Sequence, residues 1–217
     1  MTAGGRHRYG AVLVLALGMT TFALAAPEGR ATRTLELAGA GATLVAAMLT
    51  SGARPGVRRI ATVALVVALI LAVAAAVAGA PRGMVLLAAT GVASAVTIAV
   101  IVGGLVRLVR EEGVGIQAVF GAVAVYLLVG LTFGFLIGAF ATGADGDYFA
   151  QGTDGTQSQR VYFSFTVLTT SGFGDLTART APARALAVLE MLVGQLYLVT
   201  VIATLVGNLR RRDGRAP

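Results

Sequence analysis

The sequence has no cysteine and no lysine, a single histidine and few charged residues. Without cysteine there is no disulfide framework, no thiolate nucleophile and no cysteine metal site. The one histidine, His7, stands between Arg6 and Arg8 ahead of the first apolar run, where we expect a solvated side chain and not a ligand or a general base. The apolar runs also lack the paired carboxylates that an intramembrane enzyme would need. We therefore expect no enzyme and no cofactor.

Charge is scarce, and most of it has one sign. Only 12% of the 217 residues are charged, 57% are hydrophobic and the mean hydropathy is +0.85, so lipid and not water is the solvent for most of the chain. The net charge of +7 comes entirely from arginine. In a polytopic membrane protein a basic excess usually lies in cytoplasmic loops that face anionic lipid, so no nucleic-acid partner is expected.

Six apolar runs are long enough, or nearly so, to cross a bilayer as helices, each of which takes about 20 residues. None of the runs alternates apolar and polar residues as the wall of a barrel would. The sequence therefore predicts an all-α membrane protein with about six transmembrane helices. The predicted spans are Tyr9–Ala26, Leu35–Thr50, Ile60–Ala80, Gly83–Val106, Ile116–Thr142 and Arg184–Asn208.

The arginines predict how the chain crosses the membrane. With both termini in the cytoplasm, most arginines lie inside, as the positive-inside rule requires, and a prokaryotic plasma membrane is the expected location. The connection Gly143–Arg160 then lies outside, where its aspartates give cations a favourable potential. An alternative is that the first run, which ends in Ala23-Leu24-Ala25, is a cleaved signal peptide, leaving five spans. The inside arginines are Arg6, Arg8, Arg54, Arg58, Arg59, Arg107, Arg110, Arg210, Arg211, Arg212 and Arg215.

Between the last two spans lies a segment that is too short to cross the bilayer. It consists of a moderately apolar stretch, Val161–Thr170, followed at once by Ser171–Asp175. This is typical of a re-entrant helix and a turn back, and irregular backbone at membrane depth is tolerated only where it is buried in protein or lines a watery path. A ring of carbonyls that replaces the hydration shell of K⁺ is one such path. Gly172 and Gly174 suit the alternating backbone angles that would aim successive carbonyls at one axis.

This segment resembles the filter of the potassium-channel pore family, which reads Thr-Val-Gly-Tyr-Gly-Asp. The filter residues here are Thr170, Ser171, Gly172, Phe173, Gly174 and Asp175, with Thr169 before them and a span on each side. The resemblance covers about residues 116–208 and implies the order outer helix, pore helix, filter and inner helix, with Thr166 and Thr169 in the pore helix. It implies that K⁺ is bound by the backbone carbonyls of Thr170, Ser171, Gly172 and Phe173. The Thr170 hydroxyl would lie at the inner end, Phe173 would wedge outward and Asp175 would join an acidic ring at the outer mouth.

A carbonyl cage needs four such loops and the chain has one, so a homotetramer is implied. Two residues depart from the family pattern. Ser171 stands where the family usually has Val or Ile, and this replacement would loosen the selectivity for K⁺. Phe173 stands where the family has Tyr, a replacement that we treat as mild. A weakly selective Na⁺/K⁺ channel, a non-conducting accessory subunit and a plain glycine-rich turn remain open as alternatives. The sequence gives no indication of the gating stimulus.

The pattern divides the chain into a four-span region, residues 1–112, and a pore domain, residues 113–217. The fourth span has no arginines within it, and Arg107 and Arg110 stand at its cytoplasmic end, so strong voltage dependence is not expected. Polar residues in a span are costly and mark function or pairing. In the last span these are Glu190, for which we expect structural pairing, Gln195, Tyr197 and Asn208. Gly194 is either a gating hinge or a site of close helix contact. Arg210, Arg211 and Arg212 would anchor the span at anionic headgroups.

Overall fold

The computed structural model of the chain describes residues 9–51, 82–143, 146–205 and 207, together with positions 56, 59, 62, 63 and 66. The predicted span Ile60–Ala80 lies almost wholly outside these residues, as do His7, Asn208 and the arginine cluster Arg210, Arg211 and Arg212. The described ranges form helices joined by turns, with isolated bridges only, so the all-α fold is confirmed. The helices are α1 (Tyr9–Ala25), α2 (Arg30–Thr50), α4 (Arg82–Glu112), α5 (Ile116–Gly143), α6 (Gln157–Leu168), α7 (Ala181–Leu196) and a π-helical stretch η1 (Tyr197–Ile202).

Three helical segments of the described chain are long and apolar enough to cross a membrane. They are Leu87–Glu111, Ile116–Thr142 and Ala181–Leu205, and two shorter apolar helices cover Tyr9–Ala25 and Leu35–Thr50. The expected character of a membrane protein is thereby confirmed, while the number of six spans stays a prediction.

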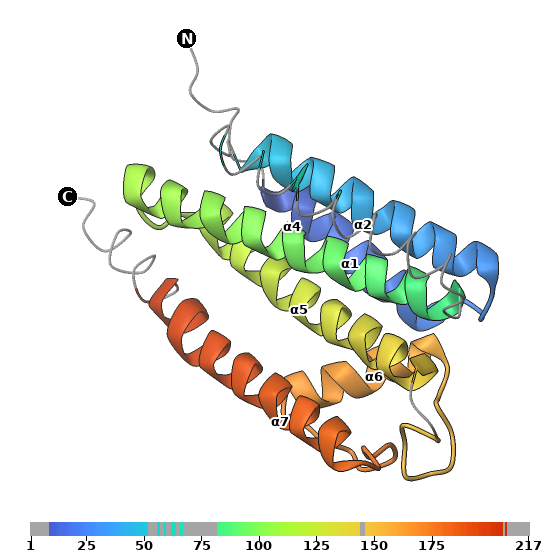
Figure 1. Cartoon of the computed structure of the whole chain (residues 1–217). Coiled ribbons are helices and arrows are strands. Elements are labelled where there is room, and N and C mark those ends of the chain that lie inside the picture. The colour runs from blue at the N-terminus through green and yellow to red at the C-terminus, as the bar shows by residue number, and fades with distance from the viewer. Residues whose placement is uncertain are drawn as a thin grey trace.

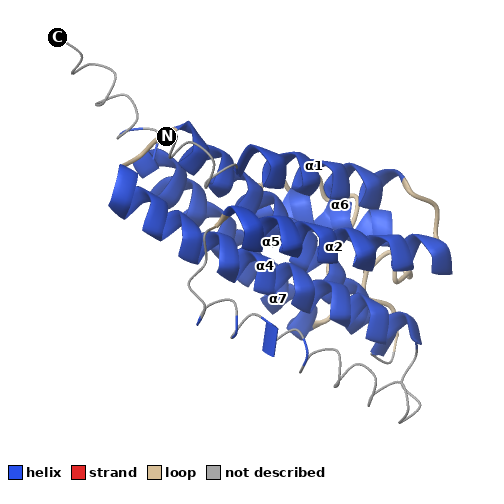
Figure 2. Cartoon of the chain, turned by 90° about the horizontal axis from the view of Figure 1, so that it is seen from above, coloured by secondary structure: helices blue, strands red, loops and turns tan. Residues whose placement is uncertain are grey.

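The helices α1, α2, α4 and α5 lie side by side as a bundle, with α6 and α7 at one side of α5 (Figures 1 and 2). One core joins both halves of the chain, because Val12 of α1 and Ile101 of α4 are buried in the same cluster as Leu128 and Phe135 of α5. The predicted boundary after residue 112 falls at the turn between α4 and α5, and apolar packing continues across it. The helices α1 and α4 therefore pack against α5 and stabilise it, and α5 in turn packs against α6.

The short helix α6 begins at Gln157, four residues before the predicted Val161, because a capping box starts it there. The hydroxyl of Thr156 accepts a hydrogen bond from the backbone N–H of Gln159 at 3.2 Å, and the Gln159 side chain accepts from the N–H of Thr156 at 2.8 Å. These bonds satisfy two donors that a helix start otherwise leaves free. The helix ends at Leu168, directly before the predicted filter.

The helix α7 begins at Ala181, where the pair Ala181-Pro182 predicts a helix start shortly before the apolar span from Arg184. Thr180 caps it, since its hydroxyl accepts from the N–H of Ala183 at 3.3 Å, and Pro182 occupies the first turn, where a missing N–H costs nothing. The α-helical hydrogen bonding stops at Leu196 and gives way to the π-helical stretch Tyr197–Ile202. Nothing in the sequence pattern predicted this change.

Candidate functional site

The segment after α6 has a left-handed backbone at every second residue. The φ angles are 57° at Thr170, 48° at Gly172 and 80° at Gly174. Within the described chain Thr170 is the one non-glycine residue with positive φ, a conformation that costs an L-residue about 1–2 kcal/mol. Alternation of this kind can turn successive carbonyls to one side of the chain, which is the arrangement an ion cage needs. The two glycines lie where the pattern required them, and Thr170 shares their conformation.

The first half of this segment is fastened to the end of α6. The N–H of Thr170 donates to the carbonyl of Val167 at 2.9 Å, and the N–H of Gly172 donates to that of Thr166 at 3.1 Å. The hydroxyls of Thr169 and Ser171 are 2.6 Å apart and share a hydrogen bond. The polar side chain of Ser171 is thus held by Thr169, which lies just after the last residue of α6 and not within the helix. The predicted pore-helix residues Thr166 and Thr169 adjoin Thr170–Asp175, which is called the filter segment after its predicted role.

The second half of the segment is open in the single chain. The ring of Phe173 stacks on that of Tyr162 in α6, with centroids 6.3 Å apart and planes 6° apart, but its side chain remains 72% exposed. Phe173, which we expect to point outward from the filter, therefore does not insert into the core of its own subunit. The Tyr162 phenol also interacts electrostatically with the carboxylate of Asp175, so α6 contacts both the aromatic residue and the acidic residue.

Three of the polar or small residues singled out in the last span face α6 or the filter segment. The Glu190 carboxyl oxygen Oε1 lies 2.5 Å from the Ser164 hydroxyl, and the Gln195 amide donates to the Thr170 hydroxyl at 3.1 Å. A Cβ on Gly194 would lie 2.2 Å from the carbonyl oxygen of Leu168, a distance that no side chain can occupy. The close approach of α7 to the end of α6 accounts for this glycine without a hinge.

Two tyrosines connect α5 to this site: Tyr197, which the sequence marked as a polar residue of the last span, and Tyr126, which it did not mark. The Tyr126 hydroxyl donates to the carbonyl of Leu168 at 3.2 Å, and the Tyr197 hydroxyl donates to that of Ala122 at 2.8 Å. Their rings stack with centroids 5.9 Å apart. Tyr126 is likewise a polar group within an apolar span, and that signal could have marked it for pairing.

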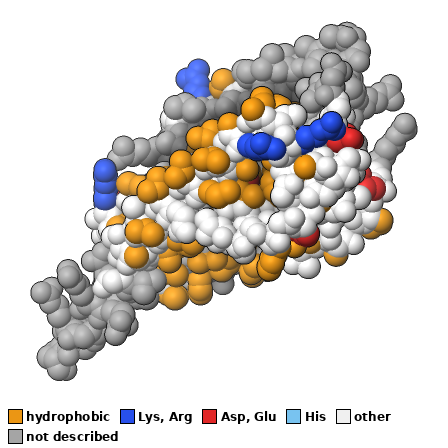
Figure 3. Space-filling model, turned by 90° about the horizontal axis from the view of Figure 1, so that it is seen from below, with side chains coloured by type: hydrophobic (Ala, Val, Ile, Leu, Met, Phe, Trp, Pro, Cys, Tyr) orange, Lys and Arg blue, Asp and Glu red, His pale blue; other side chains and the backbone are white. Residues whose placement is uncertain are grey.

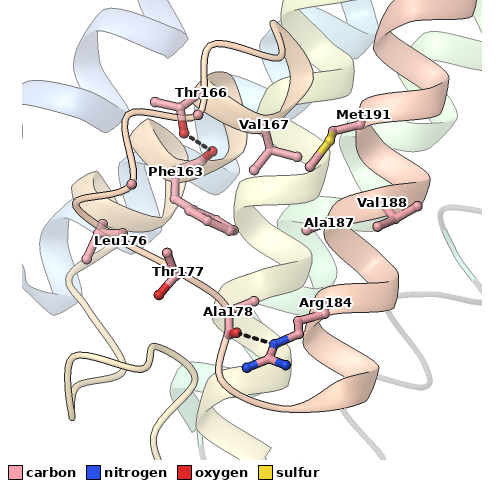
Figure 4. A pocket seen from close by; sticks show the side chains of 12 residues that line it. Phe163, Thr166, Val167, Leu176, Thr177, Ala178, Arg184, Ala187, Val188 and Met191 are labelled. Atoms are coloured by element: carbon pink, nitrogen blue, oxygen red, sulfur yellow. Dashed lines mark hydrogen bonds between the residues drawn. The ribbon is translucent and has the colours of Figure 1, made fainter.

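An apolar pocket of about 410 Å³ lies behind the filter segment, between α6 and α7 (Figure 4). Thr166 lies at its wall with its hydroxyl turned to the carbonyl of Phe163 at 2.8 Å, and the Arg184 guanidinium donates to the carbonyl of Ala178 at 3.0 Å. In the described residues no group of three or more histidine, cysteine or acidic side chains could hold a metal ion. The predicted cation ligands are instead the backbone carbonyls of Thr170, Ser171, Gly172 and Phe173.

The connection before α6 is tied to the chain that follows the filter segment. The N–H of Ala150 donates to the carbonyl of Thr177 at 2.8 Å, and the Asp147 carboxylate lies 3.6 Å from the guanidinium of Arg179. The Asp154 carboxylate accepts from the N–H of Tyr148 at 2.9 Å. Two of the aspartates expected to attract cations thus also hold the connection together, and Asp145 lies outside the described residues.

The sequence of residues 119–211 matches the protein-family model described as "Ion channel". This range runs from α5 through α6 and the filter segment to beyond η1. No curated protein and no solved structure matched the chain. Within this range the structure has the predicted order: a long apolar helix, a short helix, a turn and a second long apolar helix. Residues 119–211 are therefore similar to the ion-channel family over a range that holds two long apolar helices with a short helix between them.

Proposed function

We propose that the chain is one subunit of a homotetrameric, potassium-selective channel that conducts K⁺ passively through a filter formed by Thr170–Asp175. The observation that carries this proposal is the alternating backbone at Thr170, Gly172 and Gly174, directly after a short helix in an ion-channel pore module. Carbonyls turned to one side can replace the hydration shell of an ion only if several chains surround it. Four copies supply the ring.

The surface of the pore module supports an assembly of several chains. Only 17% of the residues in the most apolar stretch of Ala181–Leu205 are buried, against 61% in that of Ile116–Thr142, although the two stretches are similarly hydrophobic. Figure 3 shows apolar side chains spread over one face of the molecule. Lipid covers part of such a surface, and neighbouring subunits would cover Phe173 and the side of α7 nearest the axis.

The test is ion flux into liposomes that carry the purified protein, driven by a potassium gradient, with sodium substituted in parallel and barium added as a blocker. Flux of K⁺ that exceeds that of Na⁺ and is blocked by barium is the expected result. Intact tetramers without flux under any gradient would favour the non-conducting accessory subunit.

The substitution Gly172→Ala tests whether the backbone of the filter carries the flux. Alanine would meet no atom within 4 Å at this position but would have to keep a φ of 48°, so the protein should assemble and lose its current. Gly152→Ala is the matched control, because Gly152 also has a positive φ and open space but lies in the connection before α6. Full current in Gly172→Ala would refute the filter.

A weakly selective Na⁺/K⁺ channel is the second candidate, and Ser171 favours it. Its hydroxyl shares a hydrogen bond with Thr169 in place of the apolar packing that Val or Ile would give behind the filter. Ser171→Val should then raise the ratio of K⁺ to Na⁺ permeability, measured as reversal potentials under bi-ionic conditions. Equal permeabilities in the unmodified protein would establish the second candidate.

The proposed orientation has both termini in the cytoplasm and the connection before α6 outside. Arg107, at the cytoplasmic end of α4, pairs with Glu111 at 2.9 Å, one helical turn away. A charge held in this way at a helix end anchors the helix and adds little gating charge. Arg210, Arg211 and Arg212 are proposed to contact anionic lipid headgroups, and a prokaryotic plasma membrane is the proposed location.

A further inference from the structure

A carboxyl group lies wholly buried behind the proposed filter. Glu190 of α7 is 0% exposed, and its Oε1 lies 2.5 Å from the hydroxyl oxygen of Ser164 in α6. Its second oxygen, Oε2, has no hydrogen-bond partner among the described residues. A buried carboxylate with one oxygen unsatisfied and no counter-charge is expensive, so the surroundings of this group decide its protonation.

Among the described residues, the groups around Glu190 supply no positive charge. The ion pairs of the described chain do not include this residue. The titratable side chains that interact with it electrostatically are the phenols of Tyr126, from α5, and Tyr148, from the connection before α6. The side that faces α6 offers the hydroxyl of Ser164. Neutral groups of this kind can hydrogen-bond to an acid, but they cannot compensate a buried anion as an arginine would.

The hydrogen bonds of Ser164 show where a proton must be. Its hydroxyl oxygen contacts two oxygens, the Gly130 carbonyl of α5 at 2.7 Å and the Glu190 carboxyl at 2.5 Å. Each of these bonds needs one proton. A carbonyl has none to give and the serine has only one, which it must donate to Gly130 because that carbonyl can only accept. The bond to Glu190 therefore requires a proton on the glutamate.

We propose that Glu190 is a neutral carboxylic acid that donates to Ser164 and thereby positions the pore helix α6 against α7 and, through Ser164, against α5. The chain of bonds runs from Glu190 Oε1 to Ser164 Oγ and on to the carbonyl oxygen of Gly130. Leu168 lies one helical turn after Ser164, and its carbonyl is the group that the backbone of Gly194 approaches closely. The bond thus fixes α6 at the level just behind the filter. The assignment of the proton goes beyond the proposed conduction of K⁺ and does not depend on which ion passes.

Infrared difference spectroscopy of the purified protein in liposomes at neutral pH tests the proton directly. The unmodified protein should show the C=O stretching band of a protonated carboxyl group, which moves on exchange into heavy water, and Glu190→Gln should lack it. Glu36→Gln is the matched control, because Glu36 is the other buried glutamate of the described residues. A difference spectrum between the unmodified protein and Glu190→Gln that contains only carboxylate bands would overturn the proposal.

Ser164→Ala tests whether the Ser164 hydroxyl accepts the hydrogen bond from the Glu190 carboxyl group, and it leaves Glu190 itself unchanged. Loss of its acceptor should shift the Glu190 band to higher frequency, and an unchanged band would show that Ser164 does not accept this proton. This measurement also serves if Glu190→Gln does not fold.

The positioning role has a separate readout in the ratio of K⁺ to Na⁺ flux. Glutamine can still donate to Ser164 whereas leucine, of similar size, cannot, so Glu190→Gln should keep a higher ratio than Glu190→Leu. Equal ratios in the two variants would refute the positioning role. The infrared result stands whether or not the protein selects K⁺, so a failure of the proposed function and a failure of this inference are distinguishable.

Discussion

At the scale of single residues, the contact between α7 and the end of α6 depends on the absence of a side chain. Because Gly194 has no Cβ, its backbone can lie close to the carbonyl oxygen of Leu168. A Cβ at this position would be only 2.2 Å from that oxygen. Helices in membranes approach closely where small residues permit it, since lipid offers no hydrophobic drive for their association. The sequence marked this position correctly as special, but it could not separate close contact from a hinge, because both uses select glycine.

Gly194→Ala should destabilise the protein by about 1–3 kcal/mol, because the methyl group would push α7 away from a backbone carbonyl that cannot yield. The same displacement should weaken the bond between Gln195 and Thr170 and lower K⁺ flux. Thermal unfolding of the purified protein and liposome flux measure the two effects. Gly103→Ala is the control, because this glycine of α4 has nothing within 4 Å of a Cβ. Equal stability of the two variants would contradict the close contact.

Gln195→Leu should lower the ratio of K⁺ to Na⁺ permeability. Its amide holds the hydroxyl of Thr170, a residue in a strained left-handed conformation, and a neutral hydrogen bond of this kind contributes about 0.5–1.5 kcal/mol. Without it, the inner end of the proposed filter should relax. Bi-ionic reversal potentials give the ratio. Gln117→Leu removes a glutamine side chain of α5 that accepts from Gly10 at 3.4 Å, away from the filter, and should leave the ratio unchanged.

At the scale of the elements, a capping box stands where α6 starts, ahead of the apolar residues of the helix. Thr156→Ala should cost about 1 kcal/mol, because the mutual bonds of the capping box are lost. Thr156→Ser keeps the hydroxyl and should keep the stability. A comparison of the unfolding temperatures of the two variants tests this, and an alanine variant as stable as the serine variant would show that packing alone fixes where the helix starts.

The order of the elements could be predicted, whereas several of their ends could not. Hydrophobic runs located the spans in the described chain, and the glycine pattern located the turn after α6. The capping pair Thr156 and Gln159 was readable in the sequence but lies before the apolar residues, so a reading by hydropathy began the helix too late. The bond between Ser164 and Glu190, and that between Tyr126 and Leu168, join residues 26 and 42 positions apart, and no local pattern encodes such pairs.

At the scale of the whole molecule, the bundle and the pore module form one packed body, which hydropathy could not predict. The end of α1 and the turn after it meet the start of α6, since the Ser158 hydroxyl donates to the backbone carbonyl of Leu24 at 2.6 Å, and the N–H of Gln157 donates to the carboxylate of Glu28. These contacts reach across more than a hundred residues of sequence. They support the start of α6, so the part of the chain before the pore module stabilises the helix that leads to the proposed filter.

The absence of native cysteine makes the orientation testable with a single label. A cysteine at Gln151, which is exposed in the connection before α6, should react with a membrane-impermeant maleimide added to intact cells. A cysteine at Arg110, near the other end of the bundle, should react only after the membrane is opened. The reverse pattern would invert the proposed topology, and reaction of both in intact cells would refute it.

The π-helical stretch Tyr197–Ile202 gives α7 a place where rotation is possible. A π turn accommodates an extra residue compared with an α turn, and one residue corresponds to about 100° of rotation about the helix axis. Conversion of this stretch to an α-helix would turn the face presented by Leu205 by about that angle. Gly194 and Gln195 precede the stretch and would keep their contacts with Leu168 and Thr170. The end of the helix after this stretch can thus change the side chains it presents while the segment proposed as the filter stays in place.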